Sequence, residues 1–74
     1  MQDYFSMYKD IWNWHKQHID HIANTDEFWR PYINEMRAIG KKYGNTQFIH
    51  DLLFAELNEI ERLAKQEEGD SNAE

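Results

Sequence analysis

Three histidines at helical spacing are the first residues of this sequence that could do chemistry. His15, His18 and His21 recur at every third position, and imidazole nitrogen is a common zinc ligand. At about 100° per residue, their side chains fan round about a third of a helical turn, so they cannot all reach one ion. One pair with a carboxylate from another helix would bind zinc only weakly. We predict no metal site and no cofactor.

Catalytic chemistry has little support in the other residue types. The chain has no cysteine, and no serine or threonine lies in a recognisable triad context. A glycine-rich phosphate loop is also missing from the sequence. A chain of 74 residues is too short to build a deep pocket. We predict that the protein is not an enzyme.

Glu56 and His15 are polar residues at positions where the helical pattern expects apolar ones. Glu56 falls near the middle of the apolar arc of its helix, and His15 falls within the apolar stripe of the first helix. Buried ionisable groups are costly unless they are paired. We predict that Glu56 forms a hydrogen bond with His15, Arg37 or a tyrosine hydroxyl and so fixes the packing register.

Three helical segments must position these side chains, at about residues 3–23, 26–43 and 47–67. In the first, apolar, aromatic and histidine residues recur in alternating steps of three and four, which predicts one buried face; they are Phe5, Tyr8, Trp12, His15, Ile19 and Ile22. No segment alternates with the period of a strand. We predict an all-α domain over residues 1–67, a three-helix bundle. The polar, acidic residues 68–74 are predicted to be disordered.

Capping and stop signals mark the boundaries of these helices. Asn24 or Thr25 is suited to cap the second helix. Pro31 lies within the second pattern and removes a backbone hydrogen bond, so we predict a loose first turn and a regular helix from about Arg30. Gly44 supplies a left-handed stop before the third helix.

Some large apolar side chains fall outside the predicted buried faces. Met7 and Trp14 point almost opposite to the predicted stripe of the first helix, and Phe54 points away from the apolar arc of the third. Aromatic anchors are enriched at protein interfaces, so we predict that these three side chains contact a partner. The alternative is that the helices pack from two directions and that the three side chains form additional core.

The charge balance narrows the class of partner. Eight basic and 14 acidic residues give a net charge of −6, which argues against direct binding to nucleic acid. Acidic side chains suit electrostatic steering toward a protein, and we assign that role to Asp51, Glu59 and Glu61. The longest apolar run, Leu52 to Ala55, is far shorter than the roughly 20 residues that span a bilayer. With no signal-peptide pattern at the start, we expect a cytoplasmic protein that does not bind membranes.

Residues 39–47 resemble the turn of a helix-turn-helix motif. The glycine and the Thr-Gln opening of the next helix match that motif, but His50 stands where it expects an apolar packing residue. Residues 45–74 hold eight acidic and two basic side chains, a net charge of −6 that DNA phosphates would repel. A DNA-binding regulator is therefore only an alternative.

Four short motifs follow one another in the second and third helices: Phe28-Trp29, Lys42-Tyr43-Gly44-Asn45, Asp51-Leu52-Leu53 and Glu59-Ile60-Glu61-Arg62. Together they resemble small helical accessory proteins of Firmicutes phages and mobile elements. The resemblance implies a bacterial host cell as the location. For a short acidic protein it also implies an anti-CRISPR-like role, the inhibition of a CRISPR effector or another defence nuclease.

These observations predict a non-enzymatic, acidic protein-binding module, in the phage setting an inhibitor of a host defence nuclease. The first alternative is a self-associating helical bundle in which Trp14 and Phe54 close a homodimer. The second alternative is the helix-turn-helix regulator.

Overall fold

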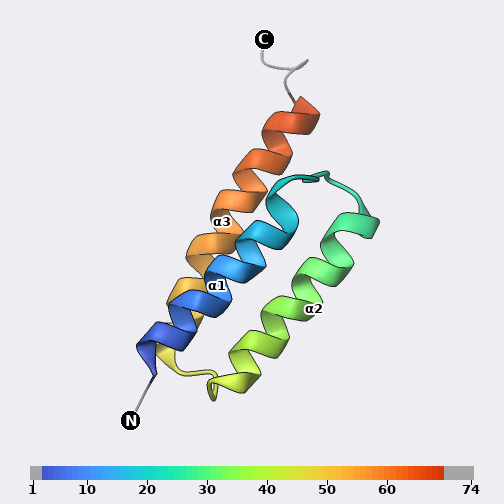
Figure 1. Cartoon of the computed structure of the whole chain (residues 1–74). Helices are drawn as coiled ribbons and strands as arrows, with labels where there is room; N and C mark the ends of the chain where they lie inside the picture. Colours follow the sequence, from blue (N-terminus) through green and yellow to red (C-terminus); the bar gives the residue numbers. More distant parts are fainter. Residues whose placement is uncertain (1–2, 70–74) are drawn as a thin grey trace.

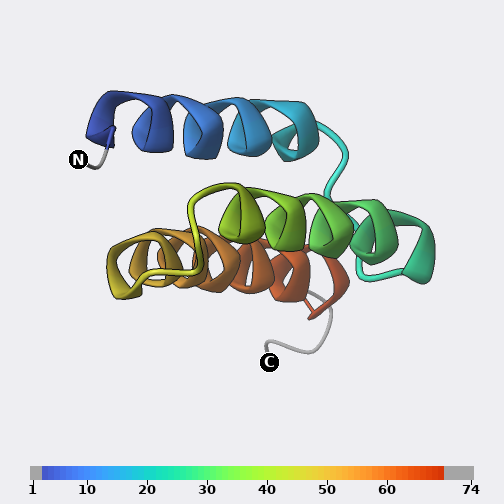
Figure 2. The same cartoon turned by 90° about the horizontal axis from the view of Figure 1, so that it is seen from below.

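The computed structural model describes residues 3–69 and contains three helices, α1 (Tyr4–Ile19), α2 (Asp26–Lys42) and α3 (Gln47–Gly69). α1 and α3 run in the same direction and α2 runs in the opposite one (Figure 1). Every helix contacts the other two, and α1 lies along one side of the hairpin that α2 and α3 form (Figure 2). The structure confirms the predicted all-α three-helix bundle.

The second helix begins at residue 26, as predicted, but its first turn is more regular than predicted. Thr25 is its N-cap, because the Thr25 hydroxyl accepts a hydrogen bond of 3.3 Å from the backbone N–H of Phe28. The helix is continuous from Asp26 through Pro31, so the predicted loose first turn and regular start near Arg30 are wrong. Pro31 removes the hydrogen bond that its backbone nitrogen would donate to the Glu27 carbonyl, and because Glu27 is exposed, water can satisfy that carbonyl.

The other helix ends also differ slightly from the predicted ones. α1 stops at Ile19 instead of residue 23, because Ile22 and Ala23 leave the helix and pack against the core from the connection to α2. α3 continues to Gly69, so the first two residues of the predicted disordered tail are helical. The rest of that tail, residues 70–74, lies outside the described residues.

Two consecutive residues in the left-handed region reverse the chain between α2 and α3. Gly44 has φ +76° and Asn45 has φ +54°, which confirms the predicted left-handed stop at Gly44. The side chain of Asn45 folds back over Gly40, where an added Cβ would lie only 2.8 Å from the Asn45 Oδ1. A glycine at position 40 therefore lets this turn close tightly.

The core lies along the line where the three helices meet. Its fully or almost fully buried apolar side chains come from all three: Met7, Trp14, Phe28, Tyr32, Ile39, Ile49, Leu53 and Ile60. α1 thus contributes Met7 and Trp14, together with the buried His18. Of the stripe that the sequence predicted, Ile19 and the following Ile22 pack half-buried against this core, whereas its aromatic residues do not. The helical period was predicted correctly for α1, but its buried face was assigned wrongly.

Candidate functional site

The buried side of α1 corrects two of the predicted contact residues. Trp14 has no exposed surface and Met7 is only 2% exposed. The Trp14 ring stacks on Tyr32 of α2 at 4.5 Å between centroids, and its Nε1 donates a hydrogen bond of 3.2 Å to the Tyr32 carbonyl. Neither Met7 nor Trp14 can reach a partner, so their predicted binding role and the Trp14 homodimer are wrong. Met7 and Trp14 belong to a second stripe on α1, whose residues recur in steps of four, three and four. This second stripe faces α2, whereas the predicted stripe does not.

An exposed aromatic surface lies on the other side of α1. It is formed by four side chains that are each at least half exposed, and we call it the aromatic face: Tyr4, Phe5, Tyr8 and Trp12. Phe5 is 74% exposed and Trp12 is 56% exposed. The prediction that Phe5, Tyr8 and Trp12 are buried is therefore wrong. Exposed aromatic side chains that adjoin one another on a small protein are typical of an interaction surface.

One edge of the aromatic face borders α3. The Tyr4 and Tyr8 rings both meet the half-buried Phe48 edge to face, with centroids 5.0 and 6.0 Å apart. The opposite edge is basic, because Lys9 and Lys16 are exposed there, and the Lys16 Nζ lies 5.8 Å from the centre of the Trp12 ring. The aromatic face thus has Phe48 of α3 at one edge and the solvent-exposed Lys16 at the other.

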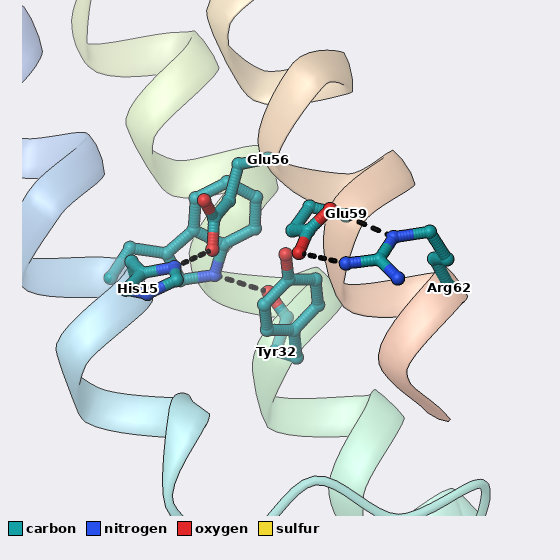
Figure 3. Close-up of polar contacts among 6 residues, drawn as sticks. His15, Tyr32, Glu56, Glu59 and Arg62 are labelled. Atoms are coloured by element: carbon teal, nitrogen blue, oxygen red, sulfur yellow. Dashed lines mark hydrogen bonds and ion pairs between the residues drawn. The ribbon is translucent and has the colours of Figure 1, made fainter. Parts of the chain in front are cut away.

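His15 and Glu56 form the predicted polar pair. The His15 Nδ1 and the Glu56 Oε2 are 2.7 Å apart, and the two side chains are 26% and 11% exposed (Figure 3). The His15 ring also stacks on the Trp12 ring, with 5.6 Å between the ring centroids. The pair therefore connects α1 to α3 and also supports the end of the aromatic face.

The Tyr32 hydroxyl lies near the same polar groups but has no hydrogen bond with any described residue. Figure 3 shows Tyr32 between the His15–Glu56 pair and the Glu59–Arg62 pair. Burial, reinforced by the negative charges of Glu56 and Glu61, raises the pKa of Tyr32 far above its ordinary value. Tyr32 therefore stays protonated.

The three predicted steering carboxylates, Asp51, Glu59 and Glu61, are all exposed on α3. Their electrostatic surroundings differ. Glu59 accepts two hydrogen bonds from Arg62, at 2.6 and 3.1 Å, and these lower the Glu59 pKa. Because Arg62 also neutralises part of the Glu59 charge, Asp51 and Glu61 are better placed to attract a basic partner.

Phe54 is exposed as predicted, at 52%. It stands beside a small hollow of about 120 Å³ between α2 and α3, and the lining includes Arg37, His50 and Leu53. Among the described residues, no carboxylate lines this hollow. A volume of this size is too small for a typical small-molecule pocket, but it could receive a single side chain of a partner.

The three histidines do not point in one direction. His18 is buried, with its Nε2 3.3 Å from the Glu35 Oε1, and His15 turns toward α3. His21 follows the end of α1 and is exposed, with its ring centroid 5.7 Å from that of His18. Within residues 3–69 no three histidine, cysteine, aspartate or glutamate residues gather closely enough to hold a metal ion. Among these same residues, no helix combines the length and the apolar character needed to cross a membrane.

The α2–α3 turn does not arrange its helices as a helix-turn-helix motif does. Figure 1 shows α2 and α3 side by side in opposite directions, whereas the helices of that motif cross steeply. The exposed carboxylates of α3 also argue against a DNA-binding helix, because DNA phosphates would repel them.

Models of known protein families, curated proteins and solved structures were each compared with this chain, and none of the three comparisons found a match. The resemblance to accessory proteins of phages and mobile elements therefore stays a prediction.

Proposed function

We propose that this protein is a non-enzymatic protein-binding module that uses the aromatic face of α1 as its contact surface. The observation that carries the proposal is the exposure of Tyr4, Phe5, Tyr8 and Trp12, between 51% and 74%, on one side of a single helix. Tryptophan and tyrosine supply much of the energy at the centre of protein interfaces. Because at least half of each ring is exposed to water, the rings contribute little to the stability of the bundle.

The shape and charge of the surface support a protein as the partner. The face is a convex helix side, and small molecules usually require a concave site. The net charge of −6 disfavours a nucleic acid. Tyrosine rings combine an apolar body with a polar hydroxyl, which suits a surface that is wet before binding and buried afterwards.

The proposal is tested by capture with two matched baits. The tagged wild-type chain and a tagged Phe5→Ala/Trp12→Ala variant are each mixed with a bacterial lysate that also contains the untagged chain. We expect the wild-type bait to retain a polypeptide that the variant loses, while Phe54→Ala retains it. Circular dichroism checks that every bait is still helical. The same polypeptides on both the wild-type and the double-variant baits would show that the face is not used.

A second candidate function is the inhibition of a defence nuclease through the other side of α3. It is favoured by Phe54, which is exposed beside a hollow without carboxylates, and by the exposed acidic side chains of α3. A purified CRISPR effector with its guide RNA provides the test: the protein should slow target cleavage, and Glu61→Lys should weaken that effect more than Glu59→Lys because Arg62 already pairs with Glu59. Unchanged cleavage at a large excess of protein removes this candidate for the effector tested.

A further inference from the structure

The two edges of the aromatic face carry opposite charges. On a helical wheel, Lys9 and Lys16 lie on the side of the face remote from Tyr4 and Tyr8, and both lysines are exposed. The edge at Tyr4 and Tyr8 borders α3 through Phe48.

On α3, Asp51 and Glu59 project within about 60° of Phe48 round the helix and are exposed. The face is therefore bordered by lysines along one edge and by carboxylates along the other.

The opposite charges also lie at matching heights. α1 and α3 run in the same direction (Figure 1), and the contacts Tyr8–Phe48 and His15–Glu56 place residues about 41 positions apart level with each other. With a rise of about 1.5 Å per residue, Lys9 is level with Asp51 and Lys16 with Glu59 to within about 3 Å.

We propose that the aromatic face is covered by a second copy of this chain, related by a twofold axis parallel to α1. Such an axis brings the basic edge of one protomer against the acidic edge of its partner. Lys9 then faces the partner's Asp51 and Lys16 faces the partner's Glu59, and each pair occurs twice. Because Arg62 already pairs with Glu59 within each protomer, the contact between Lys9 and Asp51 is the stronger of the two. A twofold axis perpendicular to α1 would instead set like charges together. This inference rests on the proposed use of the face for binding proteins.

The available area indicates a dimer of moderate strength. Four aromatic side chains of roughly 200 Å² each, about half exposed, offer on the order of 400 Å² per protomer. A standard stable interface buries about 800 Å² per partner, so the lysine stems and the edge of α3 must supply the remainder. We expect a dissociation constant in the micromolar range, between about 1 and 100 μM.

Sedimentation equilibrium of the purified full chain, from about 1 μM to 1 mM at low salt, tests the inference. The expected mass rises with concentration from the 9.0 kDa of one chain toward twice that value. Phe5→Ala/Trp12→Ala should remain monomeric over the range. A wild-type chain that stays monomeric to about 1 mM overturns the inference. If the capture experiment nevertheless finds a foreign protein bound through the face, the proposed function stands without it.

Charge reversal tests the orientation of the dimer. Lys9→Glu and Asp51→Lys should each weaken the dimer about tenfold, because each variant turns two attractions into repulsions, and the double variant should regain most of the loss. Lys41→Glu, an exposed lysine on α2, makes the same charge change away from the face and should have little effect. A dimer that Lys9→Glu leaves intact, or that the double variant does not restore, overturns the parallel arrangement.

Discussion

The two sides of α1 carry similar residues in very different surroundings. On the buried side, Trp14 finds an aromatic ring to stack on and a carbonyl to accept its N–H, both supplied by Tyr32. On the exposed side, Trp12 contacts a histidine ring and a lysine, and none of the described helices covers it. The comparison indicates that a tryptophan becomes core where a neighbouring helix offers both apolar area and an acceptor for its N–H.

Replacing each tryptophan in turn is the strongest test of the difference between the two sides of α1. Trp14→Ala should lower the free energy of unfolding by about 3–5 kcal/mol, because it leaves a cavity between α1 and α2. Trp12→Ala should cost less than about 1 kcal/mol. Urea unfolding followed by circular dichroism measures both. Because Trp14→Ala could abolish folding in so small a domain, Trp14→Phe provides an intermediate variant. Equal losses at the two positions would contradict the assignment of the two sides.

The polar pair at the boundary of the two sides should have the next largest effect. Glu56→Gln weakens a charged hydrogen bond to His15 in a position that is mostly buried. The expected loss in the free energy of unfolding at neutral pH is about 1–3 kcal/mol. Glu59→Gln, a matched change on the exposed side of α3, should leave the stability nearly unchanged. A neutral Glu56→Gln variant would show that the pair does not tie α1 to α3.

Asp10 lies at the edge of α1 that faces α2, and its contribution to the stability of the fold should depend on pH. Partial burial opposes its ionisation, but hydrogen bonds from Lys42 (2.8 Å) and Tyr43 (2.6 Å) outweigh that cost and lower the Asp10 pKa. A lowered carboxylate pKa stabilises the fold above the unfolded value of about 3.9, and that stability is lost as the pH falls through the folded pKa.

Asp10→Asn should therefore cost about 1 kcal/mol at pH 7 and much less at pH 2. Thermal unfolding of both proteins between pH 2 and 7 checks this convergence. Asp20→Asn makes the same change at an exposed position and serves as the control, which should alter the stability little. Wild-type and Asp10→Asn curves that stay parallel down to pH 2 would contradict the predicted linkage.

The smallest expected effect concerns the buried hydroxyl of Tyr32. Since the Tyr32 Oη has no partner among the described residues, Tyr32→Phe keeps the stack on Trp14 and removes an unsatisfied polar atom. The free energy of unfolding should stay the same or rise by up to about 1 kcal/mol. A loss of stability on urea unfolding would mean that the hydroxyl is satisfied in solution, for example by an ordered water.

The helices could be predicted from the sequence because their period depends on local spacing, but the buried side of α1 could not. Two stripes satisfy the same steps of three and four, and each contains a histidine, His15 in the predicted stripe and His18 in the stripe with Trp14, so residue type did not decide between them. Together, the two stripes cover an arc of α1 that is too wide for one buried face. That width was the signal that one aromatic stripe had to lie in solvent.

The contact between His15 and Glu56 was predictable for a different reason. Burying an unpaired carboxylate is costly whichever stripe faces the core, so the need for a partner did not depend on the assignment of the α1 face. The partner role of Phe54 stays a prediction, since its exposure follows from the helical period but nothing in the sequence shows what covers it.

The spacing of the main contacts along the chain has a consequence for the order of folding. Trp14 and Tyr32 are 18 residues apart, whereas His15 and Glu56 are 41 apart. Closing the longer loop costs about 0.7 kcal/mol more chain entropy, so a hairpin of neighbouring helices, α1–α2 or α2–α3, should form first and the contacts between α1 and α3 should form last. Phe48 then reaches Tyr4 and Tyr8 only in this last step, so the aromatic face is completed when folding ends and is incomplete in a half-folded chain.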